Sequence, residues 1–510
     1  MKASQRICAL CLLAALLLPG CAQSKPDPTP ASVAAAPEST AAPEETTTED
    51  PNDRSKIKDN VPDGLRFDGQ SVRVYYRANG GGENYNFIQI LDVVGTDNNG
   101  DYVTDGVWER NRRVEDRLGI TFDFIPAEGS LSEVQGMVRN VVTAGLDEYD
   151  YIDSTGNTNI TQSLNTYLRD LSALPYVNYD ESWWWKNVIR DVSLDGKTFN
   201  YLFGDMCIYC YCQTGVVYYN KVLYENLFGD PDEMYSFVTN GTWTVDLLAE
   251  KVAAAYADTN GNGVEDAGDV FGMLKTLNQG EETPHFIQGS GIGMYHYDGD
   301  GNLVIEFDQE RSVLAIEKLG ALYVNTPGVF HSDEGLAVSP KYFAEGNILY
   351  LPSRIRQALE PSLREMKDPY GILPYPKLTE DQKEYYSLIH NSSTNVSVLK
   401  TVADTKLDVL GAAFEALCAE SYRSVMPLFL ESALKLKYSQ DSMSGQVIDM
   451  VIGSVSKNTL DEYANYCASI FNTCLRDNIT AGRNNFASSY KKLASAAQKT
   501  WDKAVANLSK

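Results

Sequence analysis

Oxygen-bearing side chains recur at short, regular spacing in the segment 258–269, Asp-Thr-Asn-Gly-Asn-Gly-Val-Glu-Asp-Ala-Gly-Asp. Acidic or amide oxygens stand at loop positions 1, 3, 5, 9 and 12, and a glycine stands at position 6. Calcium binds six to eight oxygens, and that glycine permits the sharp turn that gathers them. The segment therefore predicts one structural Ca²⁺, with ligands from Asp258, Asn260, Asn262, Val264, Asp266 and Asp269.

This loop departs from the strongest calcium-binding pattern in two places. Position 12 is Asp269 rather than Glu, and position 5 is an amide, Asn262. Both changes weaken binding, toward dissociation constants of roughly 10⁻⁴ to 10⁻³ M. The alternative is a loop of Asx turns without calcium. The related segments 97–101 and 298–302 lack glycine at position 6 and are interpreted as turns, the second within a hairpin.

No arrangement of residues points to catalysis. The chain has 4 histidines, without metal-ligand spacing, and no Gly-x-Ser-x-Gly nucleophile motif. The run Gly80–Gly82 lacks the Lys-Ser/Thr of a phosphate-binding loop. Carboxylates are abundant, but nothing in the sequence pairs two of them as a glycosidase requires. We therefore predict a binding protein rather than an enzyme, with a carbohydrate-active enzyme as the less favoured alternative.

Aromatic residues are candidates for contacts to a small-molecule ligand. The chain has 31 Tyr against 17 Phe, so most of its aromatic surface is amphipathic. A ring covers the C–H face of a sugar, while Asp, Asn and Arg meet its hydroxyls. Trp183, Trp184, Trp185 and Trp243 are candidates for this role. The alternative for each tryptophan is an ordinary place in the core.

The N-terminus is typical of an exported protein. Lys2 and Arg6 precede the apolar run Ile7–Leu18, which is short for a membrane span. The run ends in Leu18-Pro19-Gly20-Cys21, which resembles the bacterial lipobox. We predict a lipoprotein signal peptide at 1–20 and a lipid on Cys21 that holds the protein at the outer face of the cell membrane. The alternative is an ordinary signal peptide that happens to contain a cysteine.

Residues 21–65 are rich in Pro, Ala, Thr and Glu and poor in apolar bulk, which predicts a disordered tether behind the lipidated cysteine. The net charge is -26, and it changes to about -28 once the signal peptide is removed. An acidic body argues against nucleic acid as a partner. After the lipidated cysteine, we expect buried free thiols at Cys207, Cys210, Cys212, Cys418, Cys467 and Cys474, although a disulfide or metal site remains an alternative.

The remaining chain predicts an α/β fold. Strands at 72–76, 120–125 and 149–152 alternate with helices at 107–118 and 134–144. This order favours a parallel or mixed sheet with covering helices. Ligands of such sheets collect at the carboxyl ends of strands, here the loops 77–85 and 154–159. A second α/β region follows Gly215, with a strand at 216–219 and a helix at 245–255, and the C-terminal part is mostly helical.

Several segments in the same order resemble the large extracellular solute-binding proteins of carbohydrate ABC importers, a group that includes the maltose-binding protein at greater distance. They include Leu168-Arg169-Asp170-Leu171, Trp183-Trp184-Trp185, Tyr218-Tyr219-Asn220-Lys221, Gly241-Thr242-Trp243-Thr244 and Gly371-Ile372-Leu373-Pro374-Tyr375. The likeness covers residues 68 to 470. It implies a two-lobed fold with a ligand cleft at the hinge, with 66–210 and 370–420 as lobe 1 and 211–369 and 421–510 as lobe 2.

The resemblance also implies a ligand set and partners. The expected ligand residues are Asn79, Glu83, Tyr85, Ser154, Asn157, Trp183, Asp205, Trp243, Arg354 and Asn391. Asp205 stands at the expected first crossing between lobes, and Arg354 where the family's chain turns into the cleft. The expected partners are a saccharide and the permease subunits of an ABC importer, and the protein is expected to be a monomer. A surface sensor that presents its ligand to a receptor is the alternative.

Overall fold

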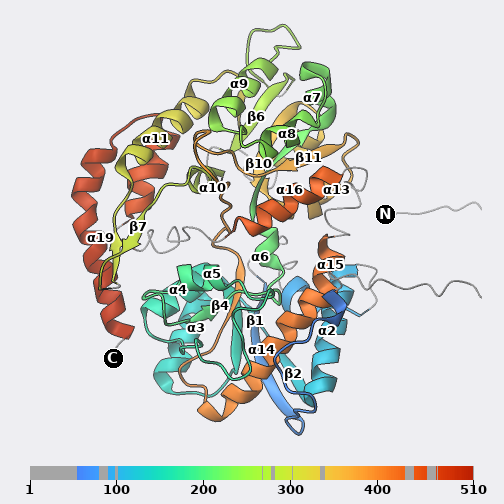
Figure 1. Cartoon of the computed structure of the whole chain (residues 1–510), viewed down its shortest axis with the longest axis vertical. Coiled ribbons are helices and arrows are strands. Elements are labelled where there is room, and N and C mark those ends of the chain that lie inside the picture. Colours follow the sequence, from blue (N-terminus) through green and yellow to red (C-terminus); the bar gives the residue numbers. More distant parts are fainter. Residues whose placement is uncertain are drawn as a thin grey trace, which may run out of the picture. The chain divides into compact units, whose positions relative to one another are not determined.

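Two separate five-stranded sheets organise the chain. The structure, a computed structural model, describes residues 54–79, 90–97, 102–266, 268–276, 282–300, 302–332, 339–430, 442–455, 467 and 469–508. In this part of the chain, no helix combines the length and the apolar character that crossing a membrane would need. We call the first sheet with its helices the first lobe, and the second sheet with its helices the second lobe (Figure 1).

The first sheet has the strand order β2-β1-β3-β12-β4. Its strands are β1 (Gln70–Asn79), β2 (Ile120–Glu128), β3 (Tyr151–Thr155), β4 (Tyr201–Leu202) and β12 (Thr394–Ser397). β1 runs parallel to β2 and β3, whereas β12 runs antiparallel to β3 and β4. In β1, fully buried Val72 and Val74 flank half-buried Arg73, which is the two-residue period of a strand.

The helices of the first lobe confirm the predicted β-α-β-α-β order. They are α2 (Tyr102–Leu118), α3 (Leu131–Ala144), α4 (Gly156–Leu164), α5 (Lys186–Asp191) and α14 (Leu407–Glu420). α3 begins earlier than predicted because Ser130 caps it. The Ser130 hydroxyl accepts the Glu133 amide at 3.3 Å, and the Glu133 carboxylate accepts the Ser130 amide at 2.6 Å. This reciprocal capping satisfies amides that the first turn leaves without partners.

The second sheet has the strand order β11-β5-β10-β6-β9. Its strands are β5 (Gly215–Asn220), β6 (Phe271–Thr276), β9 (Val329–Ser332), β10 (Ile348–Arg354) and β11 (Tyr370–Leu373). Its helices are α7 (Lys221–Phe228), α8 (Glu233–Thr239), α9 (Val245–Ala255), α10 (Glu282–Gly289), α11 (Gln309–Val324), α12 (Ser339–Ala344) and α13 (Pro361–Arg364). The predicted strand at 216–219 and helix at 245–255 are confirmed.

The predicted lobe boundaries need two corrections. Residues 370–373 were expected in lobe 1, but they form β11, which pairs antiparallel with β5 of the second sheet. The second crossing between lobes therefore lies between Leu373 and β12. Residues from 421 onward were expected in lobe 2, but the π-helical segment Ser421–Val425 and α15 (Met426–Leu428) pack on α2 of the first lobe. The first crossing contains the short helix α6 (Tyr209–Cys212).

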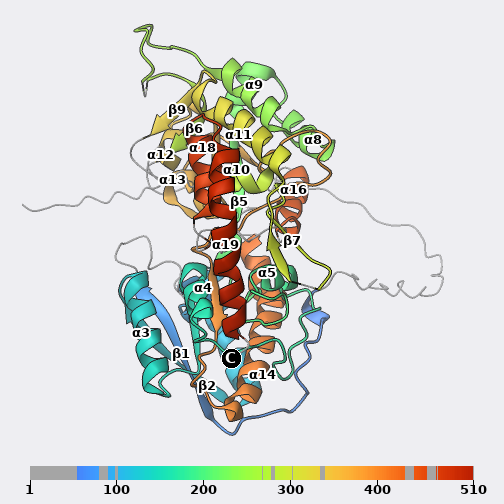
Figure 2. The ribbon, with the colours of Figure 1, turned by 90° about the vertical axis from the view of Figure 1, so that its left-hand side faces the viewer.

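The C-terminal helices are α16 (Ser442–Gly453), α18 (Asp477–Thr480) and α19 (Phe486–Leu508), and α16 packs on β11. α18 and α19 pack on α11 of the second lobe. Figures 1 and 2 both show α19 beside the small hairpin of β7 (Tyr295–Tyr297) and β8 (Leu303–Ile305). Short 3-10 or π-helical segments are Arg54–Lys56, Ile90–Val94, Ile355–Leu359, Asp404–Lys406 and Asn472–Arg476.

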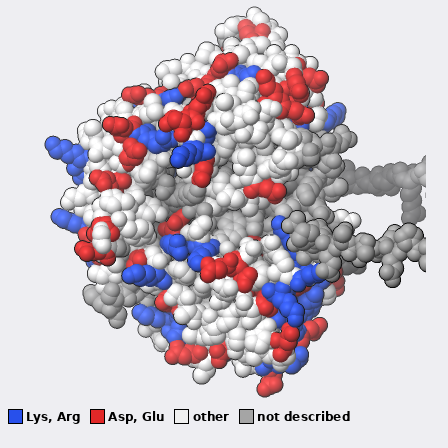
Figure 3. All heavy atoms as spheres, viewed as in Figure 1, with Lys and Arg blue, Asp and Glu red and all other residues white. Residues whose placement is uncertain are grey.

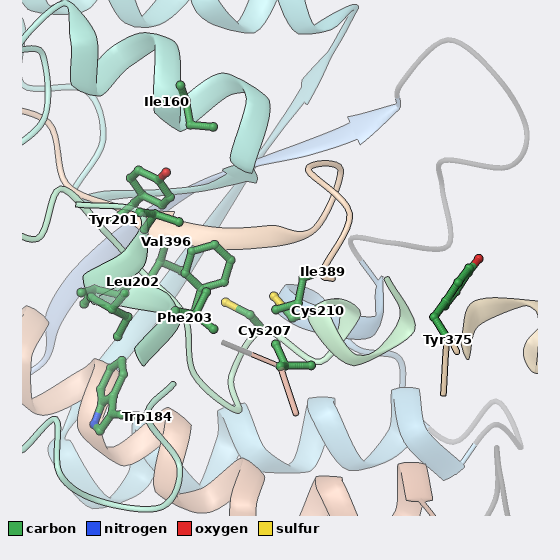
Figure 4. Packing of buried hydrophobic residues seen from close by; sticks show 14 of the residues in the cluster. Ile160, Trp184, Tyr201, Leu202, Phe203, Cys207, Cys210, Tyr375, Ile389 and Val396 are labelled. Carbon is green, nitrogen blue, oxygen red and sulfur yellow. The ribbon is translucent and has the colours of Figure 1, made fainter. Parts of the chain in front are cut away.

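The cysteines lie in the core. All six that follow the N-terminal region are described, are buried and form no disulfide with one another. Figure 4 shows Cys207 and Cys210 among Phe203, Ile389 and other apolar side chains. The Cys210 thiol donates to the Thr394 carbonyl at 2.8 Å, and burial raises the pKa of Cys207 well above its usual value. These thiols are therefore protonated packing residues, as the sequence predicted for them.

Candidate ligand-binding site

The first crossing between lobes builds a corner of two aromatic rings. Trp185 comes directly before α5, and Tyr211 lies in α6. Their ring centroids are 4.5 Å apart and their planes are inclined by 85°. One oxygen of Asp205 accepts both the Trp185 indole N–H, at 3.1 Å, and the Tyr211 hydroxyl, at 2.6 Å. Asp205 therefore holds both rings in this orientation.

Asp205 is itself buried, with 2% of its surface exposed. Burial raises the pKa of its carboxyl group to about 7, although the hydrogen bonds from Tyr211 and Trp185 oppose this rise. A carboxylate in such surroundings changes protonation state near neutral pH. The strength with which it holds the two rings consequently depends on pH.

A pocket opens against this corner, with a volume of about 410 Å³. This size falls within the range of small-molecule sites. Its walls come from the segment around α5 of the first lobe, from α6, and from the end of α16 (Figure 1). The lining residues are Tyr179, Asp180, Glu181, Ser182, Trp184, Trp185, Lys186, Asn187, Val188, Tyr211, Ile452 and Val455.

The polar groups of the pocket are held in place. Lys186 forms an ion pair with Asp180. The Glu181 carboxylate accepts the side-chain amides of Asn178, at 2.9 Å, and Asn60, at 3.2 Å. The pocket therefore combines aromatic faces with oriented carboxylate, ammonium and amide groups. On the face drawn in Figure 3, basic and acidic residues are interspersed rather than gathered by sign.

A second polar cluster lies where β3 and β12 of the first lobe meet the crossings. The Asn157 side chain donates to the Asn391 side-chain oxygen at 3.1 Å, and the Asn157 amide donates to the Asn391 carbonyl at 3.1 Å. The Gly156 amide donates to the Ser393 carbonyl at 3.0 Å. These contacts bring together two predicted ligand residues that are far apart in the sequence.

Arg354, at the end of β10, joins this cluster to the second lobe. It is buried and donates to the side chain of Gln213, the residue directly after α6. The His285 ring stacks on Tyr375 at 5.2 Å and lies 6.3 Å from His390. Burial lowers the pKa of His285 to about 3, so this imidazole is neutral. The cationic side chains that act on His390 are those of Arg354 and Arg356.

Several buried polar atoms of this cluster have no hydrogen-bond partner among the described residues. They are the hydroxyl oxygens of Ser154 and Ser393, the amide nitrogen of the Gln213 side chain, and both ring nitrogens of His285. Buried polar groups are nearly always paired in folded proteins, so a group of exceptions indicates bound water or a ligand. These atoms lie at the junction of the two lobes, beside Asn157, Asn391 and Arg354.

The predicted tryptophan contacts are placed differently. Trp183 and Trp243 are fully buried core residues, and the Trp243 indole donates to the Pro374 carbonyl at 2.8 Å. Their neighbours in the Trp run, Trp184 and Trp185, line the pocket instead. The run of three tryptophans marks the right segment, but only packing decides which ring turns outward. Tyr211 was missed because it lies in a run that looks apolar.

Three further predicted residues are placed only in part or not at all. Asn79 is the last residue of β1, opposite Glu128 of β2, and its side chain lies outside the described residues. Glu83 and Tyr85 lie outside the described residues, and so does the predicted lipidation site Cys21.

The predicted calcium loop closes on itself. The Asp258 carboxylate accepts the amides of Gly261, at 2.7 Å, and Gly263, at 2.9 Å. The Asp266 carboxylate accepts the side-chain amides of Asn260, at 3.0 Å, and Asn262, at 2.7 Å. Gly263, at position 6, has φ +72°, which a residue with a side chain rarely adopts.

These contacts pair the carboxylates of Asp258 and Asp266 with donors of the loop itself. Asp269, at the end of the loop, accepts the Thr259 amide at 3.2 Å, and the bridge between Ala257 and Val270 closes the ring. The donors fit an oxygen-liganded cation, with three carboxylates among the side chains. In the described part of the chain, no group of three or more His, Cys, Asp or Glu side chains is placed so that it could hold a metal ion.

Comparison with solved structures finds one fold repeatedly. An ABC transporter solute-binding protein from Thermotoga lettingae, bound with α-D-tagatose, has a TM-score of 0.52 and 13% identity over 85% of this chain and 100% of its own. A cyclo/maltodextrin-binding protein with maltotetraose has a TM-score of 0.53 and 12% identity over 86% of this chain and 98% of its own. A family 1 extracellular solute-binding protein from Bifidobacterium longum subsp. infantis has a TM-score of 0.50 and 12% identity over 85% and 99%.

These likenesses establish the two-lobed fold that the sequence predicted. No protein-family model matches the sequence, and no curated protein matches it either. The structural neighbours named above are binding proteins rather than enzymes.

Proposed function

We propose that this chain captures a sugar or oligosaccharide outside the cell and delivers it to the permease subunits of an ABC importer, while a lipid on Cys21 anchors it. The observation that carries the proposal is the corner of Trp185 and Tyr211, fixed by Asp205 at the mouth of a pocket between lobes. The saccharide-bound neighbours with the same fold support it.

The chemistry of the pocket suits a saccharide. One ring of the corner offers an apolar face to the C–H side of a pyranose. Asp180, Glu181, Lys186 and Asn187 offer acceptors and donors to the hydroxyls around the ring. An all-apolar ligand would cover these polar groups without offering them hydrogen bonds, and a nucleic acid would meet an acidic protein.

The arrangement of the chain suits closure around a ligand. The lobes are joined by crossings at α6, between Leu373 and β12, and after α15. A hinge absorbs motion in a few backbone dihedrals and leaves each lobe rigid. A ligand drives closure only by contacts that improve in the closed form, so residues from both lobes must touch it. The pocket meets this requirement, because α5 and α16 line it together.

A thermal-shift screen of the mature body against mono- and oligosaccharides tests the proposal. A ligand at 100 times its Kd stabilises the folded form by about 2.7 kcal/mol. We expect at least one saccharide to raise the Tm of the natural sequence and of Tyr102→Ala, an exposed aromatic residue on α2 that serves as the control. The same saccharide should not raise the Tm of Trp185→Ala. If only non-carbohydrate ligands raised the Tm, the proposal that the ligand is a sugar would be rejected.

We also propose that the loop 258–269 holds one structural Ca²⁺, through Asp258, Asn260, Asn262, Asp266, Asp269 and the carbonyl of Val264. The support is the spacing of these oxygens in the sequence and the positive φ of Gly263. The ion would replace hydrogen bonds that the loop now makes to itself. Its role would be local stability, because the loop lies between α9 and β6, and none of its residues lines the pocket.

A further inference from the structure

The hairpin β7–β8 is braced by the C-terminal helix. The Gln498 side chain of α19 accepts the Ile305 amide at 2.8 Å and donates to the Leu303 carbonyl at 3.1 Å. Beside these bonds, Phe307 packs on Tyr490 with ring centroids 5.6 Å apart. The β8 strand of the hairpin is therefore tied to α19 of the second lobe.

The hairpin touches the first lobe. The turn that follows α5 contains Gly196, with φ +69°. A Cβ built on Gly196 would stand 3.1 Å from the Tyr297 hydroxyl at the end of β7. The absence of a side chain at Gly196 lets the tyrosine approach this closely. The contact lies on the segment whose preceding helix, α5, lines the pocket with Lys186, Asn187 and Val188.

Asp191, the last residue of α5, lies in this contact. One oxygen of its carboxyl group, Oδ2, is buried and has no hydrogen-bond partner among the described residues. Its charge acts on the hydroxyls of Tyr295 and Tyr297 across the contact. Arg190 and Asp195 are also charged groups there. The hairpin itself carries His296, whose ring lies 3.3 Å from the Glu306 carboxylate. An ionised carboxylate would have to leave water for this contact without gaining a partner for that oxygen.

We propose that the β7–β8 hairpin is a proton-dependent latch between the lobes, which seats on the first lobe when the Asp191 carboxyl group is protonated and is loosened when that group ionises. The protonated group is neutral, so the seated hairpin buries no charge at this point. When the hairpin lifts, water reaches the carboxylate and the ionised form regains its hydration. The latch requires no sugar, so its test is independent of the proposed function.

The direction of the pH effect follows from the raised pKa of the Asp191 carboxyl group. Burial raises the pKa of this carboxyl group to about 7 in the seated form, whereas the nearby Arg190 opposes the rise. With the hairpin lifted, the carboxyl group returns toward the usual pKa of about 3.9. Between about pH 4 and 7, the Asp191 carboxyl group therefore takes up a proton when the hairpin seats on the first lobe. Across that window, each unit of acidification favours the seated form by up to about tenfold.

Hydrogen exchange of the unliganded protein tests the latch. We expect the protection factors of residues 295–305, corrected for intrinsic exchange, to fall at least tenfold from pH 5 to pH 8. Asp191→Asn, which is neutral at both values, should keep the low-pH protection at pH 8. Asp300→Asn makes the same change in the hairpin's own turn and should behave as the natural sequence does.

A second variant guards against a folding defect in the first. Gly196→Ala places a methyl group against the Tyr297 hydroxyl, so residues 295–305 should lose protection at both pH values while β5 and β10 keep theirs. Protection of the hairpin that does not change with pH in the natural sequence would overturn the latch. The same pH dependence in Asp191→Asn as in the natural sequence would overturn it too.

Discussion

A single carboxylate oxygen of Asp205 holds two rings, so its removal should disturb both. Asp205→Ala leaves the Trp185 indole and the Tyr211 hydroxyl without their acceptor. Losing hydrogen bonds to a charged group costs about 1.5–3 kcal/mol, so saccharide affinity should fall roughly 10- to 150-fold. Titration calorimetry with the sugar from the screen measures this. Asp63→Ala, an exposed residue outside the pocket, is the control. Unchanged affinity in Asp205→Ala would remove the ring corner from the site.

The raised pKa of Asp205 also predicts how stability depends on pH. The folded carboxyl group titrates near pH 7, whereas an unfolded one titrates near 3.9, so the folded state holds the extra proton between these values. The contribution of this residue to stability is therefore complete below about pH 4 and is lost as pH rises to 7. The loss is at most about 4 kcal/mol.

Thermal unfolding of Asp205→Asn at pH 5 and pH 8 tests the predicted loss of stability with rising pH. The variant should narrow the difference in Tm between the two pH values. Asp170→Asn, which changes an exposed residue, should leave the difference in Tm between the two pH values as it is in the natural sequence. A wider difference in Asp205→Asn would mean that the carboxyl group is ionised without penalty in the fold.

Arg354 illustrates what the sequence could and could not predict about the site. Its position at the junction of the lobes was predicted from the resemblance, but its burial was not. The structure buries it against Gln213, with 4% of its surface exposed. A buried cation cannot be removed without leaving its partners unsatisfied.

Arg354→Ala should therefore destabilise the unliganded protein by about 1–3 kcal/mol. Denaturant unfolding measures the loss, with exposed Arg364→Ala of α13 as the control. Equal midpoints for Arg354→Ala and the natural sequence would place the guanidinium in solvent.

At the scale of elements, the capping box of α3 offers a local test. Ser130→Ala removes the hydroxyl that accepts the Glu133 amide. Loss of such a cap costs about 0.5–2 kcal/mol. Ser132→Ala, exposed in the first turn of the same helix, should cost much less. Chemical denaturation of the two variants compares them directly, and equal losses would contradict the role of the cap.

The loop 258–269 is tested by removing calcium. Chelation should lower the Tm of the natural sequence, and Asp258→Ala should lose this response because it removes a predicted ligand. Asp300→Ala is the matched control, since the turn 298–302 has similar residues without the glycine at position 6. A Tm that EDTA does not change would leave the loop as a set of Asx turns.

Elements with strong local signals could be predicted from the sequence. The valines of β1 and the periodic apolar residues of α3 specify their elements without help from the rest of the chain. β11 shows where this reasoning ends. Tyr370–Leu373 has the composition of a buried strand, but its lobe depends on pairing with β5, about 150 residues earlier. The prediction of ligand residues was wrong for the same reason at Trp183 and Trp243, because packing decides which indole lies at the surface.

At the scale of the whole molecule, the lipid on Cys21 remains a prediction from the sequence. Cys21→Ala should release the protein from membranes, because the following segment 22–65 has no apolar run that could anchor it. Immunoblots of carbonate-washed membranes and of the medium measure the distribution. Cys8→Ala, within the signal peptide, is the control and should stay with the membrane. Retention of Cys21→Ala would point to another anchor.

The position of β12 in the sequence affects the order in which the two sheets can form during synthesis. This strand lies inside the first sheet, between β3 and β4, yet it comes from residues 394–397. A growing chain that has emerged as far as β11 has all strands of its second sheet, but its first sheet lacks the strand that joins β3 to β4. Open strand edges are prone to pair with other chains, and closing such a distant contact is slow. The first lobe can therefore be completed only after nearly four hundred residues have been synthesised, whereas the second sheet can form before that point.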